Sequence, residues 1–362
     1  MKRFVFPVLA SSIIAAALLY ACSGGGGTGG TYPASTGASS TKATVGLYLT
    51  DAPMDLYTQV TATVERVQLV STGTGESCDL LFTPVSVNIS NMVGIMQLVD
   101  VTQCPSGPYN RFSIQFDQAV SLMSGTTGTP SACSFTSYMD QGQGFPNKLK
   151  CDASGICTLN VTGAVNVLAQ QDNKVALDFD LKNFIITDPG TPYCAVTMKV
   201  HPLTPLQMQP IIESVTGLVS NLSTTAMTFD LTTRSTRTFH VLYSGITNTA
   251  QPDLNTLLQR AQDELLLTQV TASTIDLSAH AITAAKIEVK IAGIVSGNTG
   301  TSFTLTYRTT SSLVVDYGSA VVSGTIADGS WVLVKLIGHD QTSGDFIADK
   351  VEVGLMGMMT DN

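Results

Sequence analysis

Residues 60–70 read VTATVERVQLV, and apolar and polar residues alternate along this stretch. A period of two is typical of a strand with one buried and one exposed face. Shorter runs with the same period occur at 45–50 and 112–117, with segments rich in Gly, Pro and Ser between them. Helical periodicity is nearly absent up to residue 202. We therefore expect an all-β domain over residues 43–203, folded as an antiparallel β-sandwich.

The cysteines indicate an exported domain with disulfides. The chain has seven, and assignment of Cys22 to a lipid, argued below, leaves six. In an exported chain disulfides are the default, here up to three. A metal or haem site is the alternative, but no Cys-x-x-Cys pair occurs. Residues 152–155 (DASG) read as a hairpin turn, which favours a Cys151–Cys157 pair. The disulfide candidates are Cys78, Cys104, Cys133, Cys151, Cys157 and Cys194.

An internal repeat follows a proline-rich linker at 204–210. Residues 217–220 (GLVS) and 293–296 (GIVS) open two units, and residues 284–289 (AAKIEV) and 348–353 (ADKVEV) close them. We expect two small, related β-barrel or meander modules, here called module 1 (211–290) and module 2 (291–356). Two copies are too few for a solenoid. In the closing strands Ile287, Val289, Val351 and Val353 are expected to face the cores, and the alternating Glu288 and Glu352 the solvent.

One short helix is expected, in module 1. Apolar residues recur there at helical spacing, and Asp253 before them is a plausible N-cap. The spacing predicts about three turns. The apolar positions are Leu254, Leu257, Leu258, Ala261 and Leu265.

The first residues have the pattern of an export signal. Lys2 and Arg3 precede an apolar run of about sixteen residues, which is too short to span a bilayer comfortably as a helix. Residues 1–21 resemble a bacterial lipoprotein signal peptide, and this resemblance implies that Cys22 carries the lipid; an ordinary secretory peptide is the alternative. Residues 22–42 would form a Gly/Ser/Thr tether. Ser23, where aspartate would favour the inner membrane, indicates the outer membrane, with the face undetermined.

The composition disfavours some partners. The formal net charge is −9, and charged residues make up 12% of the chain. An acidic surface repels phosphate backbones and anionic headgroups, so nucleic-acid binding is not expected and membrane contact should come through the N-terminal lipid. No phosphate loop, dinucleotide fingerprint or nucleophile elbow occurs, and no cofactor or metal is predicted.

Two segments of the first domain resemble a known family. Residues 47–53 (LYLTDAP) and 177–182 (LDFDLK) are similar to DUF4382, a domain of unknown function found in exported bacterial proteins. The repeat units, with their Gly-x-Val-Ser openings and Ala-x-Lys-(Ile/Val)-Glu-Val endings, look like DUF5666, another uncharacterised β module. Neither resemblance implies an activity.

Four aspartates are candidates for acid–base catalysis or cation binding. Asp178 and Asp180 lie at strand spacing, so that they could act as acid and base or hold Ca²⁺, but a solvated outer face is favoured. Asp51 and Asp55 bracket a proline, and Asp51 is expected to cap a turn rather than bind a cation.

Aromatic residues are the remaining candidates for a ligand surface. Tyr109 and Tyr138 lie in polar stretches and could support a sugar ring. Phe112 and Trp331 lie in alternating strands, so they are expected in the core. We expect a non-catalytic binding or structural role in the bacterial envelope, with an envelope protein or polysaccharide as partner. The alternative is an envelope hydrolase that uses carboxylates such as Asp178 and Asp180.

Overall fold

The computed structural model describes residues 42–51, 59–92, 95–123, 131–140, 143–145, 148–208, 211–247, 251–308 and 311–354. The chain divides into a unit Met1–Ser39 and a unit Ser40–Asn362, and all that follows concerns the second. The predicted signal peptide (1–21), Cys22, the tether up to residue 41, and Asp55 lie outside the described residues.

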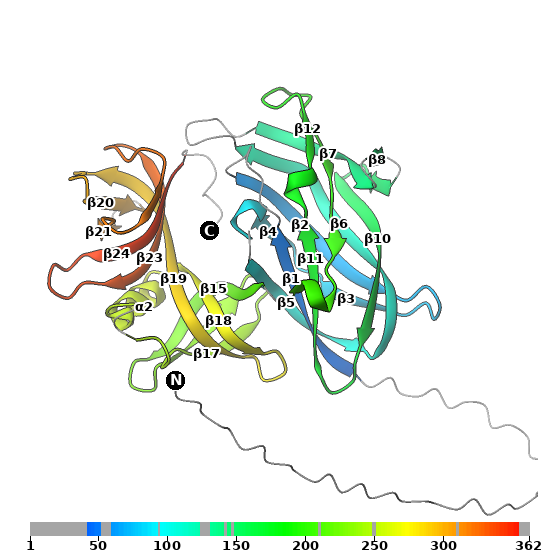
Figure 1. The fold of residues 1–362 in the computed structure, drawn as a ribbon, viewed down its shortest axis with the longest axis horizontal. Coiled ribbons are helices and arrows are strands. Elements are labelled where there is room, and N and C mark those ends of the chain that lie inside the picture. Colours follow the sequence, from blue (N-terminus) through cyan, green and yellow to red (C-terminus); the bar gives the residue numbers. More distant parts are fainter. Residues whose placement is uncertain are drawn as a thin grey trace, which may run out of the picture. The chain divides into compact units, whose positions relative to one another are not determined.

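The first domain is a sandwich of two sheets, as expected (Figure 1). Most strand pairs are antiparallel, but β1 pairs with β11 and β7 with β13 in parallel, which the sequence pattern did not predict. One sheet contains β14 (His201–Pro202), β11 (Asp172–Phe179), β1 (Lys42–Asp51) and β5 (Ile95–Pro105). The other contains β12 (Ile185–Thr187), β13 (Ala195–Met198), β7 (Ser131–Asp140), β6 (Gly107–Met123), β10 (Ile156–Val167), β9 (Leu149–Cys151), β2 (Gln59–Val70), β3 (Ser77–Leu81), β4 (Val85–Asn88) and β8 (Gln143–Phe145). The 3-10 helices η1 (Ile89–Met92) and η3 (Leu181–Asn183) also belong to the described part of this domain.

The sandwich core lies between the two sheets. Alternate residues of β1, such as Leu47 and Leu49, pack there with residues of β2 and β6. The opposite face of β1 is buried as well, because Tyr48 belongs to a second core that extends through both modules. Gly46 on that face packs closely against a leucine of module 1, because a Cβ there would lie 2.9 Å from Leu277 Cδ1. The alternation of β1 therefore separates two cores rather than a core and solvent.

Three disulfides hold the sandwich. They join Cys78 with Cys104, Cys133 with Cys194 and Cys151 with Cys157. The first connects β3 to β5 and therefore links the two sheets.

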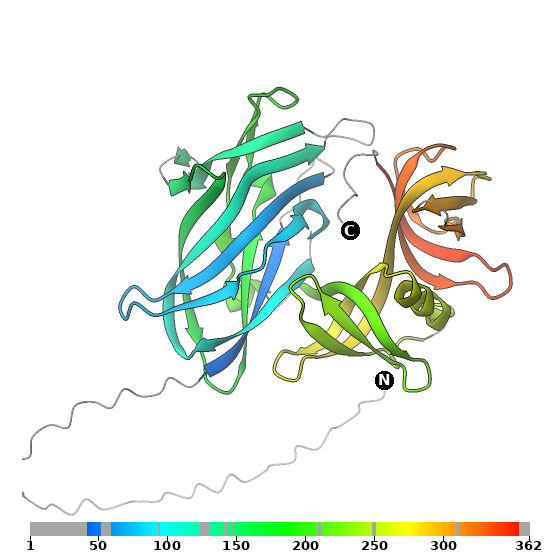
Figure 2. The same ribbon diagram turned by 180° about the vertical axis from the view of Figure 1, so that it is seen from behind.

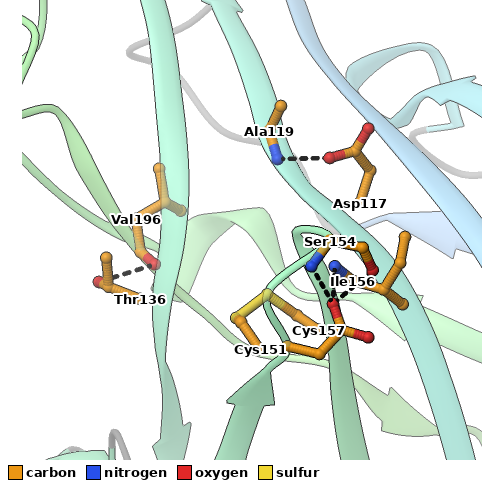
Figure 3. Close-up of a disulfide and its surroundings, with 9 residues drawn as sticks. Asp117, Ala119, Thr136, Cys151, Ser154, Ile156, Cys157 and Val196 are labelled. Atoms are coloured by element: carbon orange, nitrogen blue, oxygen red, sulfur yellow. Dashed lines mark hydrogen bonds between the residues drawn. A yellow bond between two sulfur atoms is a disulfide. The ribbon is translucent and has the colours of Figure 1, made fainter.

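The predicted Cys151–Cys157 pair closes the hairpin between β9 and β10 (Figure 3). In its turn Gly155 adopts φ +84°, and the Asp152 carboxylate accepts from the amides of Ser154 (2.9 Å) and Ile156 (3.0 Å). Hydrogen bonds from Ser154 and the backbone lower the pKa of Asp152. Local turn chemistry therefore brings these two cysteines together.

The modules continue the first sheet of the sandwich. After α1 (Pro205–Met208), a single turn within the predicted linker, β15 (Ile212–Ser223) pairs in parallel with β5. Side chains reinforce this junction: Ser235 Oγ donates to the Val99 carbonyl at 2.8 Å, and Arg237 Nε lies 3.2 Å from the buried Asp100 carboxylate.

The two modules have the same strand order, as the repeat predicts. Module 1 consists of β15, β16 (Thr228–Thr233), β17 (Thr238–Leu242), α2 (Leu254–Asp263), β18 (Leu267–Asp276) and the first half of β19 (Ala281–Ser296). Module 2 uses the second half of β19, then β20 (Ser302–Tyr307), β21 (Ser311–Asp316), β22 (Val321–Ser323), β23 (Trp331–His339) and β24 (Phe346–Gly354). The long strand β19, yellow in Figure 1, thus belongs to both modules.

The pairings are equivalent strand by strand. In module 1, β15 pairs with β16 and β18, and β17 meets β19 in parallel; in module 2, β19 pairs with β20 and β23, and β21 meets β24 in parallel. The last contact is short, with three residue pairs in module 1 and two in module 2.

Gly217 and Gly293 have the same role in the two modules. A Cβ on Gly217 would lie 2.4 Å from the Thr232 carbonyl oxygen, and one on Gly293 would lie 2.4 Å from that of Thr306. Both glycines are required by the close approach of the neighbouring strand. The glycine that opens each repeat unit is therefore explained by the close packing of two neighbouring strands.

The closing strands confirm the apolar half of the prediction and contradict part of the polar half. Ile287, Val289 and Val351 are fully buried, and the fourth predicted residue, Val353, is partly buried and packs against the same core. Glu288, however, is also buried, at 7% exposure, because it lies against Lys286, whose Nζ is 3.2 Å away. Glu352 is partly exposed and pairs with Lys350 in the same way. The charged side chains on the outer face of these strands therefore form ion pairs and are partly buried.

The predicted helix is α2, which Figure 2 shows from behind beside the module strands. Asp253 caps it by accepting from the Thr256 amide at 3.4 Å. Its buried face matches the prediction except for Leu265, which is 61% exposed with φ 51°. The helix ends at Asp263, so Leu266 turns inward instead. None of the helices in the described ranges is long and apolar enough to span a membrane.

Candidate functional site

The two segments that resemble DUF4382 meet at the ends of β1 and β11. The strands are parallel neighbours, and Asp51 lies opposite Phe179. Asp51 is buried, and its Oδ1 accepts from the Leu181 amide at 3.2 Å. It therefore holds the start of η3, which is 130 residues away in the sequence. The predicted turn before Pro53 lies outside the described residues.

Asp178 and Asp180 do not form the solvated face that the sequence predicted. Asp180 is only 7% exposed, and its Oδ2 lies 2.6 Å from Lys199 Nζ. Asp178 Oδ2 lies 3.4 Å from His201 Nε2. Burial alone would raise the pKa of Asp180, but hydrogen bonds from Lys199 and Asn183 outweigh it and lower the pKa. The alternation placed both residues on one face without showing what covers that face.

Neither predicted tyrosine offers a ligand surface. Tyr109 lies in β6 with 2% exposure and donates from its hydroxyl to the Pro105 carbonyl at 2.9 Å. Tyr138 in β7 is 8% exposed and donates to the Val200 carbonyl at 3.1 Å. Phe112 is fully buried, as expected. Both tyrosines lie within strands, not in the polar loops that the sequence predicted.

A cavity of about 520 Å³ lies beside the start of α2. Asp253 Oδ2 lies 2.9 Å from His339 Nδ1, and the pair joins module 1 to module 2. Gln251 strengthens the same junction, since it accepts from the Ile287 amide at 2.9 Å and donates to the Ile337 carbonyl at 3.0 Å. These groups serve the packing of the modules. Among the described residues no cluster of three or more His, Cys, Asp or Glu could hold a metal ion.

The strongest candidate site is a cleft of about 530 Å³. Its volume lies within the range of small-molecule sites, about 300–1,000 Å³. Its walls come from β4 and β5 of the sandwich and from β15, β19, β20 and β23 of the modules. The described residues that line it are Thr61, Val85, Ser86, Val87, Asn88, Met92, Gln97, Leu98, Val99, Thr216, Thr233, Arg234, Leu265, Leu266, Leu267, Lys290, Ile291, Ala292, Tyr307, Arg308, Trp331 and Leu333.

The cleft is cationic in an acidic protein. Arg234, Lys290 and Arg308 line it, and none of the described lining residues is Asp or Glu. Arg234 Nη1 donates to the Ser86 carbonyl at 3.1 Å. In the part of the chain that the structure describes, Lys290 and Arg308 have no ion pair or hydrogen bond from the side chain. A net positive wall of this kind favours an anionic ligand.

Lys290 is half-buried on β19, directly opposite Lys335 of β23. Burial and the Lys335 charge lower the pKa of Lys290 to about 8, against the opposing effect of Glu288 and Glu352. Of the nearby lysines, Lys286 pairs with Glu288 and Asp349, and Lys350 pairs with Glu352. Among the described residues no ion pair involves Lys335, which lies opposite Lys290.

Trp331 forms an apolar wall of the cleft rather than part of the core. It is half-buried, and its neighbour across β19 is Ile294. Its indole nitrogen Nε1 is shielded from solvent and has no acceptor within the described part of the chain, where Thr216 Oγ1 in the same cleft also has no partner. A buried donor without an acceptor costs about 1–3 kcal/mol, so both groups would gain from a polar ligand.

One feature of the sequence, the alternation in β23, indicates this site. In β23 the alternating residues Trp331, Leu333 and Lys335 share the face opposite the core. A tryptophan and a leucine on an outer face indicate a covered or ligand-binding surface. The cleft itself requires β4 and β5, which are far away in the sequence.

Residues 42–196 match the model of the family described as domain of unknown function (DUF4382). This match confirms the resemblance of the first domain. No curated protein and no solved structure matches the chain.

Proposed function

We propose that this chain is a lipid-anchored protein of the bacterial envelope that binds a ligand in the cation-lined cleft and has no catalytic role. The observation that carries the proposal is the cleft, in which Arg234, Lys290 and Arg308 have no acidic residue beside them in the described lining. Two unpartnered polar groups, Trp331 Nε1 and Thr216 Oγ1, support a polar ligand there.

The anchor is supported by the sequence alone. The basic start, the short apolar run and Cys22 before a glycine-rich stretch are typical of an exported lipoprotein. Two or more acyl chains hold a protein on a bilayer where one does not. We place the protein on the outer membrane because Ser23, not aspartate, follows the cysteine, and its partner would be an envelope protein or polysaccharide.

The alternative, an envelope hydrolase, has weaker support. Its named carboxylates, Asp178 and Asp180, are engaged with His201 and Lys199. Neither lines either of the two cavities described above. A binding role therefore agrees better with the position of the unpaired polar groups.

We also propose that modules 1 and 2 are DUF5666-like. The support is their equivalent strand order and the matching contacts of Gly217 and Gly293. The longer connection with α2 in module 1 departs from the pattern, and in module 2 the short strand β22 occupies part of the corresponding connection.

Labelling of cells with radioactive palmitate tests the anchor. The wild-type chain should take up label and sediment with the outer membrane, and Cys22→Ser should do neither. Equal labelling of the two chains would refute the anchor.

The binding role is tested with Trp331, the single tryptophan of the chain, as a fluorescent probe of the cleft. Fractionated envelope polysaccharide and protein are titrated into the unlipidated Cys22→Ser chain. A saturable change in Trp331 emission is expected for one fraction. Ala292→Tyr, in the cleft, should abolish the change, whereas Ala285→Tyr, exposed on the same strand, should keep it. An equal response of both variants would refute binding in the cleft.

A further inference from the structure

The chemistry of the cleft walls narrows the class of ligand. This inference rests on the proposed binding role and goes further by naming the ligand. Three kinds of described lining residue occur together: cations, hydroxyl or amide groups, and the half-buried aromatic ring of Trp331. The hydroxyl and amide residues are Thr61, Ser86, Asn88, Gln97, Thr216 and Thr233. Such a mixture suits a ligand that is rich in hydroxyl groups and also carries negative charge.

The charges require an anion, but not a long polyanion. The whole chain has a formal net charge of −9, so a long strand of phosphates would be repelled outside the cleft. Among the described residues no acidic group forms an ion pair with the half-buried Lys290 inside the cleft, although Glu288 and Glu352 lie near enough to influence it. An incoming carboxylate would form a charge-assisted hydrogen bond, about twice as strong as a neutral one.

The Trp331 ring in the cleft wall favours a ligand that also has an apolar surface. Trp331 lies next to Leu333 along the outward face of β23, and Ala292 lies opposite Leu333. A pyranose ring has an apolar face that can cover an indole ring, with hydroxyl groups at its edge. The Trp331 N–H and the Thr216 hydroxyl, which lack partners among the described residues, would be able to hydrogen-bond to those hydroxyl groups.

We infer that the cleft binds a short acidic oligosaccharide, with a sugar carboxylate at Lys290 and one pyranose ring against Trp331. The charge of Arg308, and that of Arg234 at the opposite wall, would bind carboxylates of neighbouring sugar units. A purely neutral glycan would leave Lys290 without a partner. A purely apolar ligand would leave the Trp331 and Thr216 groups unsatisfied.

The test uses trigalacturonate and its fully methyl-esterified form, which has the same rings without the charges. Each is titrated into the full-length, unlipidated Cys22→Ser chain, and Trp331 emission and binding heat are recorded. Trigalacturonate should bind and change the emission, and the methyl ester should bind about tenfold or more weakly.

Two lysine variants locate the charge. Lys290→Gln should weaken trigalacturonate about tenfold or more, whereas Lys182→Gln, exposed outside the cleft, should leave the affinity unchanged. Far-ultraviolet circular dichroism of Lys290→Gln checks that the chain is folded.

Some results would overturn the inference. These are equal affinity for acid and ester, binding of neither, or an unchanged affinity in Lys290→Gln. The proposed binding role would survive any of them if an envelope fraction still changed Trp331 emission and Ala292→Tyr removed that change.

Discussion

The sandwich and the two modules are stabilised by different means. Three disulfides lie within residues 78–194, and residues 211–354 have no cysteine. The modules instead share strand β19 and are joined by the buried Gln251, which bonds to the backbones of Ile287 and Ile337. Two of the three disulfides join cysteines that are far apart in sequence, whereas a repeated sequence supplies equivalent packing in the modules. One continuous sheet can therefore join a domain stabilised by disulfides to modules stabilised by packing alone.

The largest effect is expected for Val351→Asp. Val351 is fully buried in the module core, so the carboxylate would be buried without a partner. The free energy of unfolding should fall by about 4 kcal/mol or more. Val314→Asp, on β21 at 40% exposure, is the matched control and should change it by less than about 1 kcal/mol. Urea denaturation of the full mature chain measures both, and similar losses would contradict the assigned core.

The second prediction compares the stability that two of the disulfides contribute. Cys133 and Cys194 are 61 residues apart, and Cys151 and Cys157 are 6 apart. Because a longer closed loop restricts the unfolded chain more, replacing the first pair by alanine should cost about 4 kcal/mol and the second about 2 kcal/mol.

Amide hydrogen exchange then localises the loss. Protection should decrease in β6 and β10 more than in β20 and β21. An equal decrease in all four strands would show that the sandwich and the modules unfold as one cooperative unit.

The third prediction concerns the module glycines. Gly293→Ala would place a Cβ 2.4 Å from the Thr306 carbonyl oxygen, so β19 must shift away from β20, and stability should fall by about 3 kcal/mol. Gly245→Ala is the control, since nothing lies within 4 Å of that Cβ and its φ is not positive. It should change stability by less than about 1 kcal/mol. Thermal unfolding measures the two variants, and a harmless Gly293→Ala would show that the repeat glycines have another role.

The smallest effect is a pH dependence from Lys290. Its pKa is lowered to about 8, while in the unfolded chain it is about 10.4, so between these values the unfolded chain binds more protons. The free energy of unfolding should therefore rise with pH in this window, by about 1 kcal/mol after relaxation of the surroundings.

The variant Lys290→Gln should lack this rise, and Lys182→Gln should keep it. Lys335, Lys350, Glu288 and Glu352 also face Lys290, and all are unchanged in both variants. A rise that persists in Lys290→Gln would assign it to one of those neighbours.

Much of the secondary structure could be predicted because its causes are local. The alternation at 60–70 predicts β2, and the spacing of apolar residues with Asp253 predicts α2. The turn at 152–155 brings Cys151 to Cys157 within one hairpin. Each of these depends on neighbours in sequence, which the sequence displays directly.

The candidate site could not be predicted in the same way. Alternation showed that Asp178 and Asp180 share a face, but not that Lys199 and His201 cover it. Trp331 was expected in the core because its strand alternates, although it lies on the face that lines the cleft. A period of two defines which residues point together, and it leaves open whether solvent, a second core or a cleft lies beyond them.

The sequence by itself determined the all-β class, the two equivalent modules and the local hairpin disulfide, since each follows from residue spacing within one segment. The tertiary structure alone decided the Cys78–Cys104 and Cys133–Cys194 pairs, the parallel contact of β5 with β15, and the meeting of Lys290 with β4 and β5 at one cleft. These depend on contacts between distant segments. Many pairings of the strands satisfy the same alternation, and only the packing of whole sheets selects one of them.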